Sequence, residues 1–271
     1  MTGEQTEPTS DNDVDLSVPQ SARIWNYWLG GKDNFAADRA AGDAVLAKIP
    51  AIADGARAER AFLMRAVRYL VEHTGIRQFL DIGTGLPTLN NTHEVAQTLD
   101  PACRVVYVDN DPLVMAHARA LLTSTPEGAT NYLEADLRDP DVILREAATT
   151  LDFDQPIGLM LLGVINHVMD DDIAYRVVAR LASELVPGSH LVLTHSTAEI
   201  HGEPMLEVMR ETTERGGTPI RARTSAEIAR FFDGMHLLDP GVVTCSRWRP
   251  EPSEIGVPPA VYLFGGVGRI G

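Results

Sequence analysis

The sequence predicts an α/β protein with a mostly parallel sheet, preceded by an N-terminal helical cap. Three observations predict this class. From residue 76 onwards, short apolar segments alternate with helical ones, the order typical of βαβ units. Ile157–Leu162 is apolar throughout, as expected for a central strand buried on both faces. Three helical segments precede the first strand, so we expect a cap over 18–75 and a sheet domain over 76–271.

The N-terminal segments differ sharply in composition. Residues 1–17 hold five acidic residues, no basic residue and almost nothing to bury, so we expect a disordered acidic tail. The cap begins with a helix over Ser21–Leu29, which ends at a pair of glycines. A second helix ends at about Lys48. A third, over Ile52–His73, carries an apolar stripe on one face, as a helix packed on a core does.

The expected strands fall into two groups. The first five are separated by helical segments, which predicts that they run parallel. The last two have no helix between them, which predicts an antiparallel hairpin at one edge of the sheet. The strands are expected at Gln78–Ile82, Arg104–Val108, Asn131–Glu134, Ile157–Leu162, His190–Thr194, Leu237–Val243 and Ala260–Val267.

The composition excludes several classes of function. The net charge is −15 over 271 residues, so we expect no nucleic-acid partner and favour a small or neutral substrate. The two cysteines are far apart, which is typical of a reducing compartment and not of a thiolate metal site. No signal peptide and no apolar run of membrane-spanning length is visible, so we expect a cytoplasmic protein without a membrane partner.

The turn after the first strand is the main candidate for ligand binding. The segment Phe79–Thr88 passes from a short apolar run into Gly83-Thr84-Gly85. Glycine has no Cβ and tolerates positive φ, so such a turn lets the backbone approach a ligand closely. A strand before the turn and a helix after it are the context that a nucleotide-type site requires.

Two classes of ligand compete for this turn. Dinucleotide sites favour Gly-x-Gly-x-x-Gly or Ala, whereas this chain has Thr88 in the third position. Asp81 would repel a pyrophosphate but suits a cationic ligand, and S-adenosylmethionine carries an ammonium and a sulfonium without a phosphate. The charge therefore favours S-adenosylmethionine over NAD, although Asp81 could also serve only to cap the turn.

Further candidates lie at the ends of the later strands, where ligands bind in sheets of this kind. Asp109, with Asn110 beside it, ends the second strand and suits the two ribose hydroxyls. Asp136, followed by Leu137, ends the third strand and could accept from an adenine amino group. Gly163 follows the fourth strand. Both aspartates are also common turn formers, so each could have only that role.

These segments resemble, in order and spacing, the motifs of class I S-adenosylmethionine-dependent methyltransferases: Phe79–Gly85, Val108-Asp109, Ala135–Leu137 and Leu185–Gly188. With Tyr27–Phe35 and Tyr107–Pro112, the chain looks like one bacterial, largely actinobacterial family of S-adenosyl methyltransferases, first catalogued as a domain of unknown function. The match spans nearly the whole chain after the tail. The resemblance implies a Rossmann-like, seven-stranded sheet with the last strand antiparallel, and a donor bound across the ends of strands one to four. It implies no particular acceptor.

A glycine-rich loop in the cap is a second candidate region. The residues proposed there to face a substrate or the donor are Tyr27, Gly30, Gly31, Lys32 and Asn34. Lys32 could meet the donor's carboxylate or an acidic substrate. Equally, the loop could only link two helices and leave the lysine in solvent.

Candidates for the chemistry follow the fourth and fifth strands. Asn166 and His167 stand where a methyl-transfer site would be, and His167 could deprotonate an acceptor. His195 could face the substrate, although histidines at strand ends are often only hydrogen-bonded scaffold residues. No metal-ligand spacing is found, so no metal is expected.

The sequence thus predicts an S-adenosylmethionine-dependent methyltransferase that acts on a small molecule by in-line displacement. Two alternatives stay open. One is a non-catalytic protein that binds the donor as a sensor. The other is an NAD-dependent oxidoreductase, which Asp81 and Thr88 disfavour. The motifs encode neither the acceptor nor the oligomeric state.

Overall fold

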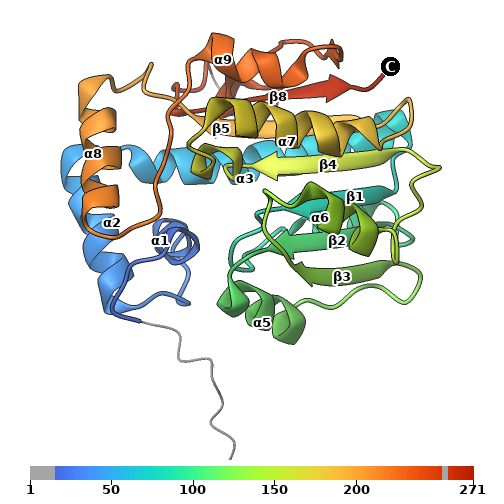
Figure 1. Ribbon diagram of the computed structural model, residues 1–271, viewed down its shortest axis with the longest axis horizontal. Coiled ribbons are helices and arrows are strands. Elements are labelled where there is room, and N and C mark those ends of the chain that lie inside the picture. Colours follow the sequence, from blue (N-terminus) through green and yellow to red (C-terminus); the bar gives the residue numbers. More distant parts are fainter. Residues whose placement is uncertain (1–15, 252–255) are drawn as a thin grey trace, which may run out of the picture.

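The fold is built on one twisted sheet of eight strands, seen in a computed structural model that describes residues 16–251 and 256–271 (Figure 1). The strand order is β3-β2-β1-β4-β5-β8-β6, and β7 pairs with β8. Their bounds are β1 Gln78–Ile82, β2 Arg104–Asp109, β3 Ala129–Glu134, β4 Ile157–Leu162, β5 His190–Ser196, β6 His236–Leu237, β7 Val243–Thr244 and β8 Leu263–Arg269.

The connectivity places a crevice at the centre of the sheet. Strands β1 to β5 pair in parallel, and β8 runs antiparallel to β5, which confirms the predicted reversal of the last strand. From the neighbours β1 and β4 the chain winds outward in opposite directions, to β2 and β3 on one side and to β5 on the other. Ligands of α/β sheets bind outside the carboxyl ends of the strands at such a reversal.

The closing part of the sheet differs from the expectation. The sequence predicted one strand over Leu237–Val243, but β6 and β7 are two separate two-residue strands, so the sheet has eight strands and not seven. The reason lies in the Pro240-Gly241 turn between them, where the Gly241 amide donates to the Leu238 carbonyl at 2.8 Å. Proline has no N–H to give to a ladder, so the strand stops and restarts.

Helices cover both faces of the sheet (Figure 1). The sequence predicted one helix over Ile52–His73. In the structure, α3 ends at Tyr69 and a wide π-helical turn over Leu70–Thr74 follows it directly. The helices are α1 Ser21–Trp28, α2 Ala36–Lys48, α3 Ile52–Tyr69, α4 Thr92–Leu99, α5 Pro112–Leu121, α6 Pro140–Ala147, α7 Asp171–Ser183, α8 Glu203–Glu214 and α9 Ser225–Ala229, with short 3-10 turns at Ile165–His167, Arg230–Phe232 and Cys245–Arg247.

Each face of the sheet has its own apolar core. Phe79 of β1 packs in the apolar cluster on the α3 face of the sheet. The next residue, Leu80, packs on the opposite face, in a cluster with residues of α6, α7 and α9. This alternation follows from the two-residue period of a strand. On the α3 face, the rings of Phe62 and Trp248 meet edge to face at 5.2 Å, and both side chains are fully buried.

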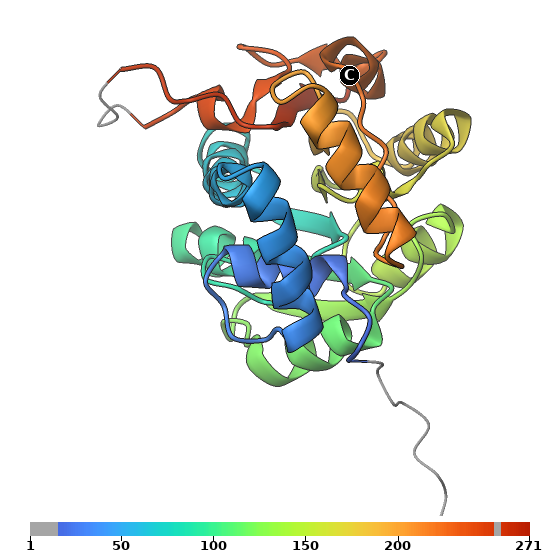
Figure 2. The same cartoon turned by 90° about the vertical axis from the view of Figure 1, so that its left-hand side faces the viewer.

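Helices α1, α2 and α8 stand together at the carboxyl ends of the strands (Figure 1 and Figure 2). Lys48 at the end of α2 forms ion pairs with Glu207 and Glu211 of α8, at 3.0 and 2.6 Å. The predicted acidic tail over 1–17 lies outside the described residues except for its last two. Within the described part of the chain, no helix is long and apolar enough to cross a membrane.

Candidate functional site

A cavity of about 590 Å³ occupies the crevice at the carboxyl ends of the central strands. Its floor is formed by the loops after β1, β2 and β4, and its walls come from α1, α2, α3 and α8. Of the residues predicted from sequence, those that line it are Asp81, Gly83, Thr84, Gly85, Asp109, Asn110, Gly163, Asn166 and His167.

The glycine turn brings two loops into contact. Gly83 has φ +74° and Gly85 has φ +63°, both in the region that favours glycine. A Cβ atom on Gly83 would overlap the side chain of Val164, so the loop after β1 is pressed against the loop after β4. A Cβ on Gly85 would meet nothing within 4 Å. The turn is therefore closed toward β4 and open toward the cavity.

Asp81 is hydrogen-bonded to the start of α4 and also faces the cavity. Its Oδ2 accepts a hydrogen bond of 2.6 Å from Thr92 Oγ1 at the start of α4, and the residue also lines the cavity. Only 6% of Asp81 is exposed, and burial raises its pKa to about 6. A cationic group in the cavity would stabilise the ionised form of this carboxylate.

Asp109 is held in place by backbone amides. Its Oδ2 accepts from Gly85 N at 2.9 Å and its Oδ1 accepts from Asp111 N at 3.0 Å. Burial raises the pKa of Asp109, whereas these amide hydrogen bonds lower it. The Asn110 amide also hydrogen-bonds this carboxylate, so three amides leave about one of its four accepting positions for a donor from the cavity.

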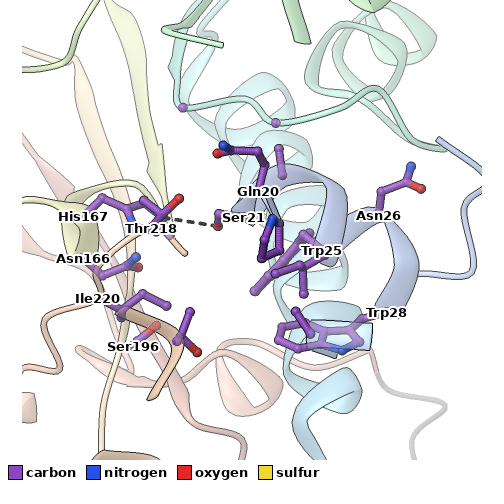
Figure 3. Close-up of a pocket in the computed structure, with 18 of the residues that line it drawn as sticks. Gln20, Ser21, Trp25, Asn26, Trp28, Asn166, His167, Ser196, Thr218 and Ile220 are labelled. Carbon is purple, nitrogen blue, oxygen red and sulfur yellow. Dashed lines mark hydrogen bonds between the residues drawn. The ribbon is translucent and has the colours of Figure 1, made fainter. Parts of the chain in front are cut away.

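The loop after β4 directs two polar side chains into the cavity. His167 Nδ1 donates to the Pro219 carbonyl at 2.9 Å, which leaves the lone pair of Nε2 facing Ser21 Oγ at 3.4 Å. Burial lowers the pKa of His167, which favours the neutral ring. Asn166 is 3% exposed, and Figure 3 shows its amide on the same wall as His167, opposite Trp25.

Two residues of α3 that the sequence reasoning missed complete the polar end of the cavity. Glu59 is 6% exposed and accepts a hydrogen bond from Thr194 Oγ1, and burial raises its pKa to about 7. Arg60 Nη2 donates to the carbonyls of Leu89 and Asn90, at 3.0 and 2.8 Å. Burial lowers the pKa of the Arg60 guanidinium, and Asp81 and Glu59 oppose that effect.

Three buried polar atoms on the cavity wall have no hydrogen-bond partner: Arg60 Nε, Thr88 Oγ1 and Asn166 Oδ1. In the part of the chain that the structure describes, only two other buried side-chain polar atoms are unpaired, and neither belongs to a lining residue. An unpaired buried polar group costs about 1–3 kcal/mol. The cavity is therefore prepared for a ligand that supplies both acceptors and donors.

Two predicted residues lie beside the cavity and not on its wall. Asp136 bonds Arg138 through both carboxylate oxygens, and that contact holds the pKa of Asp136 below its ordinary value. Leu137 packs in the apolar core beneath β3. Neither residue presents its side chain to the cavity lining.

The predicted cap residues also lie off the cavity wall. Helix α1 directs Trp25 and Trp28 inward, and Tyr27 instead donates to Asp43 at 2.7 Å. Asn34 donates to Asn26 Oδ1 and to the Gly31 carbonyl, both at 2.9 Å, so the glycine loop is tied to its own helix. Gly30 and Lys32 are exposed and outside the cavity lining.

His195 is fully buried behind the cavity. Its Nδ1 pairs with the Ser196 carbonyl at 2.8 Å, and its Nε2 accepts from Arg223 Nη1 at 2.8 Å. Its ring stacks on Phe231 at 6.0 Å between centroids. Burial lowers the pKa of His195 to about 3, which favours the neutral ring, and the residue does not line the cavity. Among the described residues, no cluster of three or more His, Cys, Asp or Glu side chains could hold a metal ion.

Comparison with known proteins gives a consistent result. A family model described as "S-adenosyl methyltransferase" matches residues 7–271. The crystal structure of a DUF574 family protein from Streptomyces avermitilis is 43% identical with a TM-score of 0.90, covering 95% of this chain and 99% of that one. A methyltransferase candidate from Thermobifida fusca is 40% identical with a TM-score of 0.86, covering 94% and 96%.

More distant structures share only the fold. Human N-acetylserotonin methyltransferase in complex with S-adenosylmethionine is 16% identical with a TM-score of 0.51, covering 91% of this chain and 62% of that one. No curated protein matches the sequence.

Proposed function

Since the chain belongs to the S-adenosyl methyltransferase family, an S-adenosylmethionine-dependent group, we propose that it methylates a small molecule held in the cavity described above. The observation that carries this proposal is the pairing of opposite charges at the polar end of that cavity. Glu59 and Arg60 are consecutive on α3, and both line the cavity beside Asp81. The amino-acid end of S-adenosylmethionine carries an ammonium and a carboxylate, which are the complementary charges.

The residues present fit the donor. Arg60 Nε is an unpaired buried N–H donor, and a carboxylate is the acceptor that a guanidinium binds best. Glu59 and Asp81 have raised pKa values because they are buried, and an ammonium between them would favour their ionised forms. We propose that Arg60 binds the donor's carboxylate and that the two acids bind its ammonium.

The other end of the donor would lie over the loops after β1 and β2. We propose that the Asp109 carboxylate accepts from the donor's ribose, because it lines the cavity and its three backbone amide contacts leave an accepting position. Asn110 and the open Gly85 turn lie beside it on the cavity wall. We leave Asp136 out of the donor contacts, because it does not line the cavity and its carboxylate is paired with Arg138.

The chemistry then depends mainly on position. When bound, the donor supplies a methyl group on a positively charged sulfur. The loop after β4 runs from Gly163 to Asn166 and His167. A Cβ atom added to Gly163 would lie 3.2 Å from Glu59 Oε1, so this loop passes close to that carboxylate. We propose that Asn166 and His167 hold the acceptor nucleophile, with the reacting atoms about 3–3.5 Å apart as in-line transfer requires. His167 Nε2 can take up a proton that the acceptor releases.

Calorimetry with S-adenosylmethionine and with NAD tests the donor site directly. We expect the protein to bind the first and not the second, and Asp109→Ala to weaken donor binding at least tenfold. Asp154→Ala is the matched control, because Asp154 is exposed in the turn before β4, at the opposite end of the strands. Unchanged affinity in Asp109→Ala, with melting temperature preserved, would reject the ribose assignment.

Turnover separates an enzyme from a sensor. Incubation with the donor and a panel of small molecules is expected to yield S-adenosylhomocysteine, detected by mass spectrometry. Donor binding without any S-adenosylhomocysteine across the panel would contradict the proposed activity on small molecules.

A further inference from the structure

The wall of the cavity that faces Asn166 and His167 carries large apolar side chains. Trp25 and Trp28 of α1 lie opposite these two residues (Figure 3), with their rings 6.0 Å apart and tilted by 57°. Alanines of α2 and the Met205 side chain of α8 continue this wall. Aromatic faces pack well against flat rings, so the wall suits an apolar body that contains a ring.

The charges around the cavity disfavour an acidic acceptor. The acidic lining residues are Glu59, Asp81, Asp109, Asp111 and Glu211, against Arg60 and Arg215. The Arg215 guanidinium pairs with Glu211 at 3.3 Å, and the proposed donor binding occupies Arg60. A carboxylate or phosphate on the acceptor would therefore find no unpaired guanidinium among the described lining residues.

Two hydrogen-bond acceptors are directed at the proposed position of transfer. Asn166 Oδ1 is buried and unpaired. His167 Nε2 presents a lone pair, because its Nδ1 donates to the Pro219 carbonyl. Within the described chain, the only hydrogen bond of Nε2 is to Ser21 Oγ at 3.4 Å, a long hydrogen bond that a ligand can replace.

A primary amine matches this pair, because it carries two N–H donors and one lone pair. With both N–H groups engaged, the lone pair is fixed in direction and can point at the donor's methyl group. A hydroxyl has one donor only, so it would leave one of the two buried acceptors unpaired.

We propose, on the basis of the function given above, that the acceptor is an apolar aromatic amine that donates its two N–H groups to Asn166 Oδ1 and His167 Nε2. The amine nitrogen uses its lone pair to form the bond to the methyl carbon. The carbon–sulfur bond breaks, and its electron pair stays on sulfur, which becomes a neutral thioether. The nitrogen becomes a methylammonium and loses one proton to His167 Nε2, which passes it to solvent.

The depressed pKa of His167 is consistent with an aromatic amine. An aromatic amine is weakly basic because its lone pair is delocalised into the ring, so it enters the cavity neutral and needs no base before the attack. Once methylated, its ammonium is acidic enough to protonate even a weakly basic imidazole. An alkylamine would arrive protonated and would need a stronger base.

Three probes of one shape test this inference: indan-5-amine, indan-5-ol and indane-5-carboxylate. Each is titrated by calorimetry into the protein saturated with S-adenosylhomocysteine. We expect the amine to bind at least tenfold more tightly than the alcohol, and the carboxylate not to bind. With S-adenosylmethionine, mass spectrometry is expected to show N-methylindan-5-amine.

The Asn166→Leu variant removes one of the two acceptors and keeps the volume. We expect it to reduce the ratio of amine to alcohol affinity to within threefold, and S-adenosylhomocysteine titration of the same sample shows that the variant is folded. Equal or tighter binding of the alcohol or the carboxylate by the native protein, or no binding of the amine, would overturn the inference. If S-adenosylhomocysteine itself does not bind, the proposed function fails as well, so the two failures are distinguished.

Discussion

Replacing Arg60 by methionine tests whether the paired charges of α3 recognise the donor. In the free protein, Arg60 makes two hydrogen bonds, to the carbonyls of Leu89 and Asn90, and its Nε is buried without a partner. Methionine fills the volume of the arginine stem but donates no hydrogen bond. The change therefore removes the proposed contact to the donor's carboxylate.

The expected effect follows from these contacts. A hydrogen bond to a charged group contributes about 1.5–3 kcal/mol, so loss of one such contact weakens donor binding about tenfold to 150-fold. The free protein loses two hydrogen bonds but is relieved of an unpaired buried N–H, which costs about 1–3 kcal/mol. These effects on the free energy of unfolding oppose each other, so we expect affinity to fall much more than stability.

Calorimetry with S-adenosylmethionine and urea unfolding of the same preparations measure the two quantities. Arg57→Met is the matched control, since Arg57 lies on the same helix with a 62% exposed side chain and a surface ion pair to Asp54. Exposed pairs contribute about 0–1 kcal/mol, so we expect this variant to bind the donor within twofold of the native protein. A dissociation constant for Arg60→Met within threefold of the native value would refute the carboxylate assignment.

Three further predictions concern pH, the core and the glycine turn. Burial raises the pKa of Glu59 from its ordinary value of 4.5 to about 7. The native protein should therefore lose up to about 3 kcal/mol of unfolding free energy relative to Glu59→Gln as pH rises from 4.5 to 7. Urea unfolding at pH 5 and pH 8 measures this difference, and a gap between the proteins that does not change with pH contradicts it. Phe62→Ala removes a fully buried ring and should cost about 3–5 kcal/mol in the same assay, with a loss below 1 kcal/mol as the contrary result. Gly83→Ala should lower the melting temperature and the donor affinity, because its Cβ would overlap Val164. Gly75→Ala is the control, since Gly75 has nearly the same φ of +75° but lies in open space, and this variant should cost only backbone strain. Equal losses in the two variants would argue against close contact of the loops.

The central fold could be predicted because its signals are local. Strands β2, β4 and β5 contain short apolar runs, and the helices between strands carry an apolar stripe, so most of the order of elements is encoded segment by segment. The strand prediction failed in the segment after α9, where the apolar residues on both sides of Pro240 have the composition of a single strand. Whether a proline ends a strand depends on the hydrogen bonds of its neighbours, and those are set by the turn at Gly241.

The site was predicted best where backbone geometry defines it. The glycine turn and the acids that end β1 and β2 all line the cavity, because strand order alone brings those ends together. Glu59 and Arg60 were missed because α3 was interpreted as a core helix. A signal was present: Glu59 falls three and four residues before Phe62 and Leu63, on the apolar stripe. A charged residue at such a position indicates a buried polar site.

The glycine-rich loop of the cap shows the opposite case. Its composition suggested a ligand-binding loop, but Asn34 and the Gly31 carbonyl bond within the segment. Which face of α1 meets the cavity depends on how the helix packs on the rest of the protein, and the aromatic residues on several of its faces leave that undetermined. The inward face carries Trp25 and Trp28, three residues apart, whereas Tyr27 lies on another face.

The position of β8 has a consequence for the order of folding. This strand follows all the others in the chain but lies between β5 and β6 in the sheet, and its neighbour Tyr262 contributes to the cavity wall. During synthesis, β5 therefore emerges from the ribosome with one edge unpaired, and it stays so until residues 263–269 follow. Pairings between distant segments form slowly and leave strand edges exposed in the meantime. The cavity is thus among the last features to form, and a nascent chain that lacks β8 should be unable to bind the donor and acceptor together.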